Sequence, residues 1–198
     1  MALPGYGGET QPYVVYGGKS GQWQKVDEKV KTPVTLGEII IDLENLRTGW
    51  GKFADGQAPE WVMNKDKTVF GPIPSEAVDK DGKKMWKKGV KVTFFSPATF
   101  GGDGLRAFDT TAFGAYSGIS QALDLYEAAA AANPGKVPVF AYKGFTNHGS
   151  GQKATTIPQF ELLRWVDRPA GLVAGGAPQT VHAANQAAPV QKAAVGEF

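Results

Sequence analysis

The sequence predicts a mostly β domain with one helix, and three observations support this fold class. Hydrophobic residues make up 42% of the 198 residues and aromatic residues 11%, which is enough for a substantial core. Glycine (26 residues) and proline (13 residues) are abundant, which favours many turns and short strands over long helices. Several short β-branched or alternating segments lie between these turns. A chain of this length is typical of one domain with additional terminal segments.

The expected domain has a loose segment at each end. Residues 1–12 are rich in Gly and predict a flexible arm, and residues 13–169 contain the folded domain. From residue 170 onward the composition shifts to Ala, Gly, Pro, Gln and Val, with almost no charge and no lasting strand or helix period. We therefore expect 170–198 to be a disordered tail.

The first strands are expected in the N-terminal half of the domain. Residues 13–16 predict a short strand that turns at two glycines, and residues 22–26 could pair with it as a hairpin. The run 38–43 is rich in β-branched side chains, which favours a strand over a helix. Residues 45–53 predict a second strand or a strong bend, because glycine inside a strand pattern often marks a bulge.

The most distinctive stretch is residues 80–97. It opens with five lysines around Trp86 and continues after Gly89 as an alternating segment, 90–95, that is typical of a β-strand. Lysines bind phosphates as point charges, and a flat aromatic ring offers a nucleobase a stacking surface. The stretch predicts either a strand that binds single-stranded nucleic acid or a solvated lysine hairpin with Trp86 in the core.

One helix and two further strands complete the pattern. The helix is predicted to begin near 117–120, with Ser120 as a suitable N-cap, and to end at the Asn-Pro-Gly sequence 133–135. Strands are expected at 137–142 and 158–166. Five or six short strands, glycine bends and one inserted helix fit an OB-fold-like small Greek-key barrel, and a β-sandwich is the main alternative.

Composition argues against several classes of function. The chain has no cysteine and only two histidines, His148 and His182, which leaves little support for thiolate chemistry, a zinc site or a Ser-His-Asp triad. It contains neither of the common phosphate-binding glycine motifs. We therefore expect no cofactor, no metal and no enzymatic activity. The net charge is only +2, so binding of nucleic acid would depend on local clusters of charge.

Two further absences bear on location. The N-terminus lacks the apolar segment of a signal peptide, and no apolar run approaches the roughly 20 residues that cross a bilayer. These observations predict a cytoplasmic protein that does not contact membranes.

The candidate site consists of aromatic side chains with cations beside them in the sequence. Strand alternation places Trp50 and Lys52 on one face, where a ring for base stacking would lie beside a phosphate contact. The helix carries only Asp124 and Glu127 as charges, so it offers no basic surface for reading duplex DNA. The predicted nucleic-acid-binding residues are Arg47, Trp50, Lys52, Phe53, Lys84, Trp86, Lys87, Lys88, Lys91 and Phe94.

Several segments together resemble bacteriophage single-stranded DNA-binding proteins of the OB-fold kind. They are residues 39–45, 48–53 and 87–92 and the final pair, Glu197 and Phe198. Such proteins typically end in a run of acids before the phenylalanine, whereas this chain has only Glu197. The resemblance implies sequence-independent coating of single-stranded DNA in replication, recombination or repair, without catalysis. It also implies that the tail residues recruit replication or recombination proteins, and a homodimer is one option for assembly.

Two other classes of protein also fit the sequence. One is a structural or interaction β-barrel protein of a phage, for which salt-sensitive oligonucleotide binding is not expected. The other is a metal-dependent phosphoryl-transfer enzyme, because Glu38, Asp42 and Glu44 would share one face of a strand and could hold a divalent ion. Asp42 could equally pair with Arg47. Magnesium-dependent cleavage of DNA would indicate the enzyme.

Overall fold

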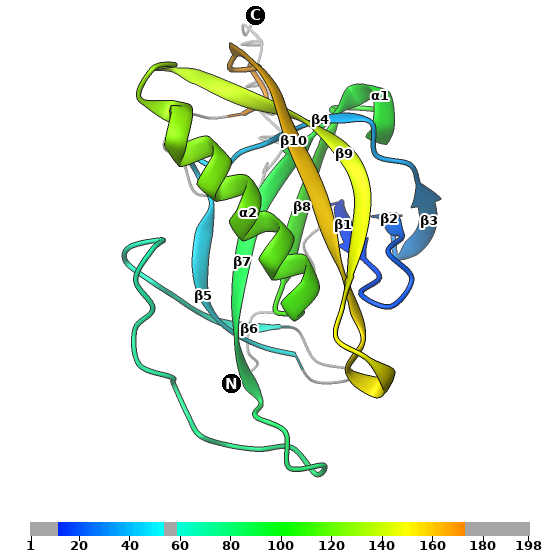
Figure 1. Cartoon of the computed structure of the whole chain (residues 1–198), viewed down its shortest axis with the longest axis vertical. Helices are drawn as coiled ribbons and strands as arrows, with labels where there is room; N and C mark the ends of the chain where they lie inside the picture. Colours follow the sequence, from blue (N-terminus) through cyan, green and yellow to red (C-terminus); the bar gives the residue numbers. More distant parts are fainter. Residues whose placement is uncertain (1–11, 54–58, 173–198) are drawn as a thin grey trace, which may run out of the picture.

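The computed structural model describes residues 12–53 and 59–172, which form one curled sheet with a long helix packed against it (Figure 1). The strands are β1 (Tyr13–Tyr16), β2 (Trp23–Asp27), β3 (Val30–Val34), β4 (Glu38–Ile41), β5 (Arg47–Lys52), β6 (Glu60–Met63), β7 (Trp86–Phe95), β8 (Leu105–Thr110), β9 (Lys136–His148) and β10 (Thr155–Asp167). The helical segments are α1 (Pro97–Phe100), α2 (Phe113–Ala130) and the short 3-10 turn η1 (Gly151–Lys153).

The sheet is curled into a half-barrel, and the predicted fold class is confirmed. Neighbouring strands follow the order β10-β9-β4-β7-β8-β1-β2-β3, and β5 and β6 extend the sheet beside the first half of β7. Strand pairs are antiparallel throughout the described chain, apart from one parallel contact between β1 and β8. A mostly β, curled sheet with one long helix corresponds to the expected OB-fold-like barrel.

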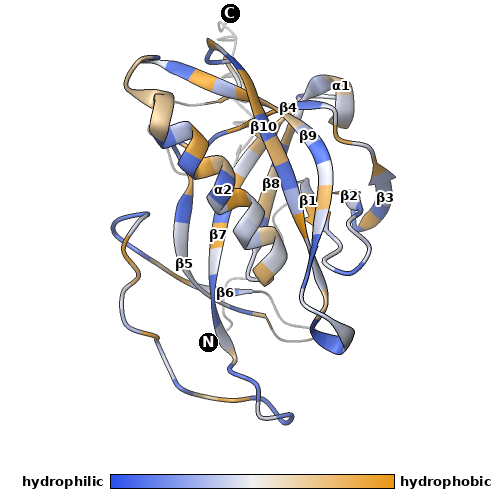
Figure 2. Cartoon of the chain, in the orientation of Figure 1, coloured by the Kyte–Doolittle hydropathy of each residue, from blue (hydrophilic) through white to orange (hydrophobic). Residues whose placement is uncertain are grey.

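Strand β7 connects the two halves of the sheet. Its first six residues pair with β5, its last six with β8, and its last two also with β4. Its inward row includes Val90, Val92 and Phe94, which are buried in one core cluster with Ile119 of α2. In Figure 2 the upper part of β7 and its neighbours is largely hydrophobic, whereas its lower end is hydrophilic. The core therefore fills one half of the inner face and leaves the other half open.

An aromatic cluster around Trp23 fills the middle of the half-barrel. The Trp23 ring is 2% exposed, and its centroid lies 5.6 Å from that of Phe94 and 5.3 Å from that of Phe108. Tyr142 of β9 and Phe160 of β10 approach it from the other side, at 6.1 and 6.3 Å. Tilted and edge-on ring pairs of this kind stabilise a core beyond the area they bury. The cluster thus joins strands from both ends of the sheet.

Hydrogen bonds also connect the turn after β1 to the beginning of β10. The Gly18 carbonyl oxygen accepts from the Thr156 amide at 2.7 Å and from the Thr155 hydroxyl at 3.0 Å. The Tyr16 hydroxyl donates to the Thr156 hydroxyl oxygen at 2.7 Å. Burial is the main cause that raises the pKa of Tyr16 above its usual value, because it disfavours the charged phenolate. These contacts connect two strands that lie far apart in the sheet order.

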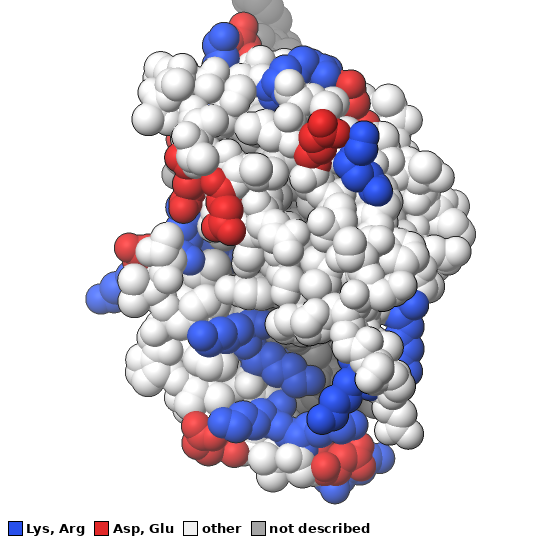
Figure 3. Space-filling model, viewed as in Figure 1, with Lys and Arg blue, Asp and Glu red and all other residues white. Residues whose placement is uncertain are grey.

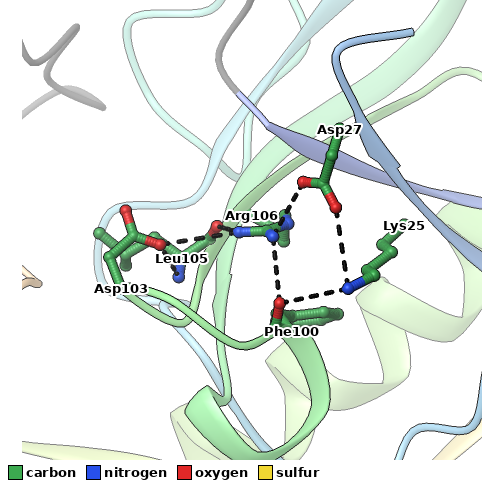
Figure 4. A network of polar contacts seen from close by, with 6 residues as sticks. All are labelled: Lys25, Asp27, Phe100, Asp103, Leu105 and Arg106. Carbon is green, nitrogen blue, oxygen red and sulfur yellow. Dashed lines mark hydrogen bonds and ion pairs between the residues drawn. The ribbon is translucent and has the colours of Figure 1, made fainter. Parts of the chain in front are cut away.

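A buried arginine connects β8 to β2 and α1 (Figure 4). One terminal nitrogen of Arg106 donates to the Phe100 carbonyl at 3.2 Å and pairs with Asp27 at 2.9 Å. The other donates to the Leu105 carbonyl at 2.6 Å. Lys25 lies 3.8 Å from the same Asp27 carboxylate. A buried charge needs partners of this kind to offset the loss of water, so the network stabilises the end of the barrel remote from β6.

Helix α2 differs from its predicted start. It begins at Phe113 rather than near 117–120, and Ser120 lies inside it instead of capping it. Packing explains the longer helix, because Gly114 and Gly118 approach β10 closely. A Cβ atom at these positions would lie 2.1 and 2.6 Å from carbonyl oxygens of β10. Gly114 and Gly118 therefore belong to a helix that packs closely on β10.

The last strands and the domain boundary also extend beyond the prediction. Strands β9 and β10 are 13 residues each and meet at a hairpin that includes residues expected to be loop. Leu172, assigned to the predicted tail, is 4% exposed and packs with Ile40, Val137 and Val139. The folded domain therefore continues past residue 169. Residues 1–11 of the predicted arm at 1–12, and the rest of the tail with Glu197 and Phe198, lie outside the described residues.

Within the described chain, none of the helices has the length and apolar character that crossing a membrane requires.

Replacing Phe94 by alanine is expected to lower the free energy of unfolding by about 3–5 kcal/mol, because it leaves a cavity in the aromatic cluster. Urea unfolding followed by circular dichroism measures this change. Phe113→Ala is the matched control, since that side chain is 58% exposed and its loss should cost no more than about 0.5 kcal/mol. Equal losses for the two variants would contradict the assignment of Phe94 to the core.

Candidate nucleic-acid interface

The candidate interface lies where β5, β6 and β7 extend beyond the core. Residues directly opposite one another in an antiparallel ladder share a face of the sheet. Trp50 lies opposite Lys88, and Lys52 lies opposite Trp86. We call these four residues the aromatic–lysine face. Trp86 and Lys88 continue the inward row of β7 beyond Val90, its last core residue at this end. With Trp50 and Lys52 of β5 they make aromatic rings and cations alternate on the part of the inner face that the core does not fill.

Contacts hold the rings of the aromatic–lysine face in place. The Trp50 indole N–H donates to the Gly71 carbonyl at 2.9 Å, and the Phe70 ring meets Trp50 edge-on at 5.8 Å. The Lys88 amine lies 4.7 Å from the centre of the Phe70 ring. The Lys52 amine lies 5.9 Å from the centre of the Trp86 ring. Both tryptophans remain partly exposed, so each is positioned but still accessible to a ligand.

Positive charge gathers on this side of the molecule. Figure 3 shows lysine and arginine side chains around a hollow below α2, at the lower ends of the strands. Lys52 forms an ion pair with Glu60 at 2.6 Å, in which the Glu60 side chain is 53% exposed. Lys88 forms no ion pair with any carboxylate in the part of the chain that the structure describes. Its charge is therefore available to a phosphate.

Four of the other predicted residues lie on the opposite face of the same strands. Arg47 lies opposite Lys91, and Lys87 lies opposite Gly51 on that outer side. The Lys91 amine pairs with Asp109 at 2.7 Å and lies 5.1 Å from the Trp61 ring centre. Phe53 meets Trp61 edge-on at 5.7 Å. Because strand alternation separates the two sets, the ten predicted residues do not form one surface.

Two predicted residues do not fit a binding groove. Phe94 is fully buried, so its predicted role in base stacking is wrong. The same two-residue period that exposes Trp86 and Lys88 on the inner side of β7 carries Phe94 into the core. Lys84 lies in the loop before β7, where it pairs with Glu76 at 3.0 Å. It is not part of the aromatic–lysine face.

The glycines of β5 and β7 allow close approach of neighbouring groups and do not mark a bulge. β5 pairs with β7 in unbroken register from Arg47 to Lys52, so the second strand predicted for this stretch is confirmed and the alternative of a strong bend is wrong. A Cβ atom at Gly89 would lie 2.4 Å from the Thr110 carbonyl oxygen and 2.8 Å from the Trp61 ring. The Trp61 indole therefore packs over a strip of bare backbone on the outer side.

Several residues of the interface region escaped sequence analysis. Phe70 comes from the irregular segment between β6 and β7, where no periodic pattern identifies it. Tyr116, near the start of α2, lies 6.5 Å from Phe70 between ring centroids. The ring of Phe113, the first residue of α2, packs on the His148 ring at the end of β9, with 5.1 Å between the ring centroids. The sequence shows that these residues are aromatic. Only the fold shows that their rings lie at the same end of the half-barrel.

The three acids considered for a metal site contact arginines instead. Glu38 pairs with Arg164 at 2.5 Å, and Arg168 pairs with Asp42 at 3.1 Å and also with Glu44. The hydrogen bond from Arg164 holds the pKa of Glu38 below its usual value. The alternative pairing of Asp42 with Arg47 is therefore wrong. Among residues 12–53 and 59–172, no group of three or more His, Asp or Glu side chains is arranged to hold a metal ion.

No protein-family model, curated protein or solved structure matches this chain.

Replacing Gly89 by alanine is expected to lower the free energy of unfolding by about 1–3 kcal/mol, because the new methyl group would overlap a backbone carbonyl. Chemical unfolding measures the loss. Gly37→Ala is the matched control: no neighbouring atom lies within 4 Å of its Cβ position. It should leave the free energy of unfolding unchanged or raise it by up to about 1 kcal/mol. If Gly89→Ala were as stable as Gly37→Ala, the close packing of Trp61 over β7 would be refuted.

Proposed function

We propose that the protein binds single-stranded DNA without sequence readout along the strand, and that it serves replication, recombination or repair without a catalytic step. The observation that carries this proposal is the alternation of two tryptophans and two lysines, in two opposed pairs, on one partly exposed face. Base stacking on an aromatic side chain contributes about 1–3 kcal/mol per base and tolerates any base. Lysines beside the rings neutralise phosphates, and counterion release makes such binding sensitive to salt.

The details of the face fit a flexible single strand. Trp50 and Trp86 lie on neighbouring strands, so an unpaired chain that crosses them can stack bases in succession. The pair between Lys52 and Glu60 is exposed, and exposed pairs contribute only about 0–1 kcal/mol, so a phosphate can compete for the lysine. Helix α2 carries Asp124 and Glu127 as its only charges, and an acidic helix is unsuited to the major groove of duplex DNA.

Protein binding by the same region is a second candidate function. Val62 of β6 is 46% exposed, and Val69 and Val78 of the following segment are 63% and 54% exposed. Exposed apolar side chains are typical of protein interfaces where they form a contiguous patch. On this alternative the aromatic residues would contact a protein partner, and oligonucleotides would not bind.

Titration of labelled oligo-dT at low and high salt tests the proposed function. We expect tight binding with quenching of tryptophan fluorescence, weaker binding in high salt, and much weaker binding of a duplex. Trp50→Ala should weaken oligonucleotide binding by about 1–3 kcal/mol, because one stacking surface is lost. Trp165→Ala is the control, since that ring packs on Tyr126, at 5.6 Å, away from the face. If no oligonucleotide binds at low salt, the proposed function is wrong and a protein partner should be sought.

Adjacent lysines of β7 provide a sharper test of which face binds. Lys88→Ala removes a cation from the aromatic–lysine face and should reduce the slope of log K against log salt by about 0.7, the value for one phosphate contact to a single strand. Lys87→Ala changes the same residue type one position away, on the outer side, and should leave affinity and slope nearly unchanged. If Lys87→Ala reduces the slope and Lys88→Ala does not, the strand binds instead to the outer face, around Trp61.

A further inference from the structure

A cavity of about 350 Å³ lies between α2 and the sheet, directly beside the aromatic–lysine face. Lys88 lines both the cavity and the face, and Phe70, which also lines the cavity, contacts Trp50 edge-on at 5.8 Å. A DNA strand stacked on Trp50 would therefore pass the mouth of the cavity. The volume falls at the lower end of the range of about 300–1,000 Å³ that small-molecule sites occupy.

The cavity combines groups that suit a nucleotide. Phe70 and Tyr116 supply aromatic surface, with ring centroids 6.5 Å apart, and Ile119 and Val90 supply an apolar floor. On the sheet side the Lys88 amine is free of ion pairs with described carboxylates. The site thus offers aromatic and apolar surface among polar side chains, with two lysines, Lys67 and Lys88, in its lining. It lies next to a surface that would hold the phosphates.

The wall formed by α2 carries the opposite charge. Asp124 and Glu127 both line the cavity, and residues three apart on a helix lie on the same face. Neither carboxylate forms an ion pair with a lysine or arginine of the described chain. Ionised carboxylates only accept hydrogen bonds, so this wall can pair with an N–H donor and repels a carbonyl oxygen.

We propose that one base of a bound strand turns into this cavity and that its exocyclic amino group donates to Asp124 or Glu127. Cytosine, adenine and guanine carry such an amino group, whereas thymine and uracil present a carbonyl oxygen in place of the cytosine amino group and have the ring N3–H as their one donor on that edge. The site therefore favours an amino-bearing base at one nucleotide in each bound stretch. This inference rests on the proposed function, and it adds a modest base preference to binding that is otherwise independent of sequence.

Oligo-dC and oligo-dU of equal length provide the test, because the two pyrimidines differ only in the amino or carbonyl group at C4 and in the hydrogen on the neighbouring ring nitrogen N3. Titrations at pH 8 avoid protonation of cytosine. We expect the whole protein to bind oligo-dC about fivefold more tightly than oligo-dU, the effect of one net hydrogen bond. The double variant Asp124→Asn with Glu127→Gln should bring this ratio close to one, because an amide can donate to uracil as well as accept from cytosine.

Asp167→Asn and Glu161→Gln together form the matched control, since both residues lie on β10 and the pair removes the same two charges. This control should keep the fivefold ratio, and thermal unfolding checks that both double variants are folded. Tight but equal binding of oligo-dC and oligo-dU by the unaltered protein would overturn this inference while leaving the proposed function intact. A ratio that survives in the Asp124 and Glu127 double variant would also overturn it. Failure of both oligomers to bind would overturn the proposed function and the inference together.

Discussion

The inward row of β7 is the constraint on which the rest of the structure depends. Every second residue of this strand faces the inside of the half-barrel, and its two ends meet different surroundings. At one end Val92 and Phe94 pack under α2 and against the aromatic cluster. At the other end Trp86 and Lys88 continue the same row where no core covers them. The core fixes the strand's orientation, and that orientation presents the tryptophan and lysine to a ligand.

The two sides of the β5–β7 pair have different chemistry for the same reason. On the inner side each ring lies opposite a lysine, and Lys88 has no described carboxylate partner. On the outer side the rings and cations contact one another, since Lys91 pairs with Asp109 and Trp61 covers Gly89. A ligand at Trp61 or Lys91 would have to displace those outer contacts, whereas on the inner face Lys88 is free of described carboxylates and Lys52 pairs with a Glu60 side chain that is 53% exposed. This difference, rather than the count of lysines, favours the inner face.

Much of the fold was predictable from local patterns. The strands that became β4, β7 and β10 have β-branched or alternating sequences, and the pattern identified one helix and its end. Their full lengths were not predictable, because the first turn of α2 packs closely on β10 at Gly114, and local patterns do not encode such a contact. The glycines of β5 left a strand and a bend both open, because sequence alone does not distinguish a bend from a position where another side chain packs against the backbone.

The sequence by itself determined the residue types of the candidate site and placed Trp50 and Lys52 on one face of a strand. Only the structure showed that β7 begins at Trp86, so that Trp86 and Lys88 also share a face. Only the tertiary structure decided that these two pairs oppose each other and that Phe94 lies in the core. It also decided that Asp42 and Glu44 pair with Arg168, more than 120 residues away in the chain. Alternation along a strand is a local property of the backbone, so sequence reveals it. Strand register and the depth of the core depend on contacts between distant segments, which local patterns do not encode.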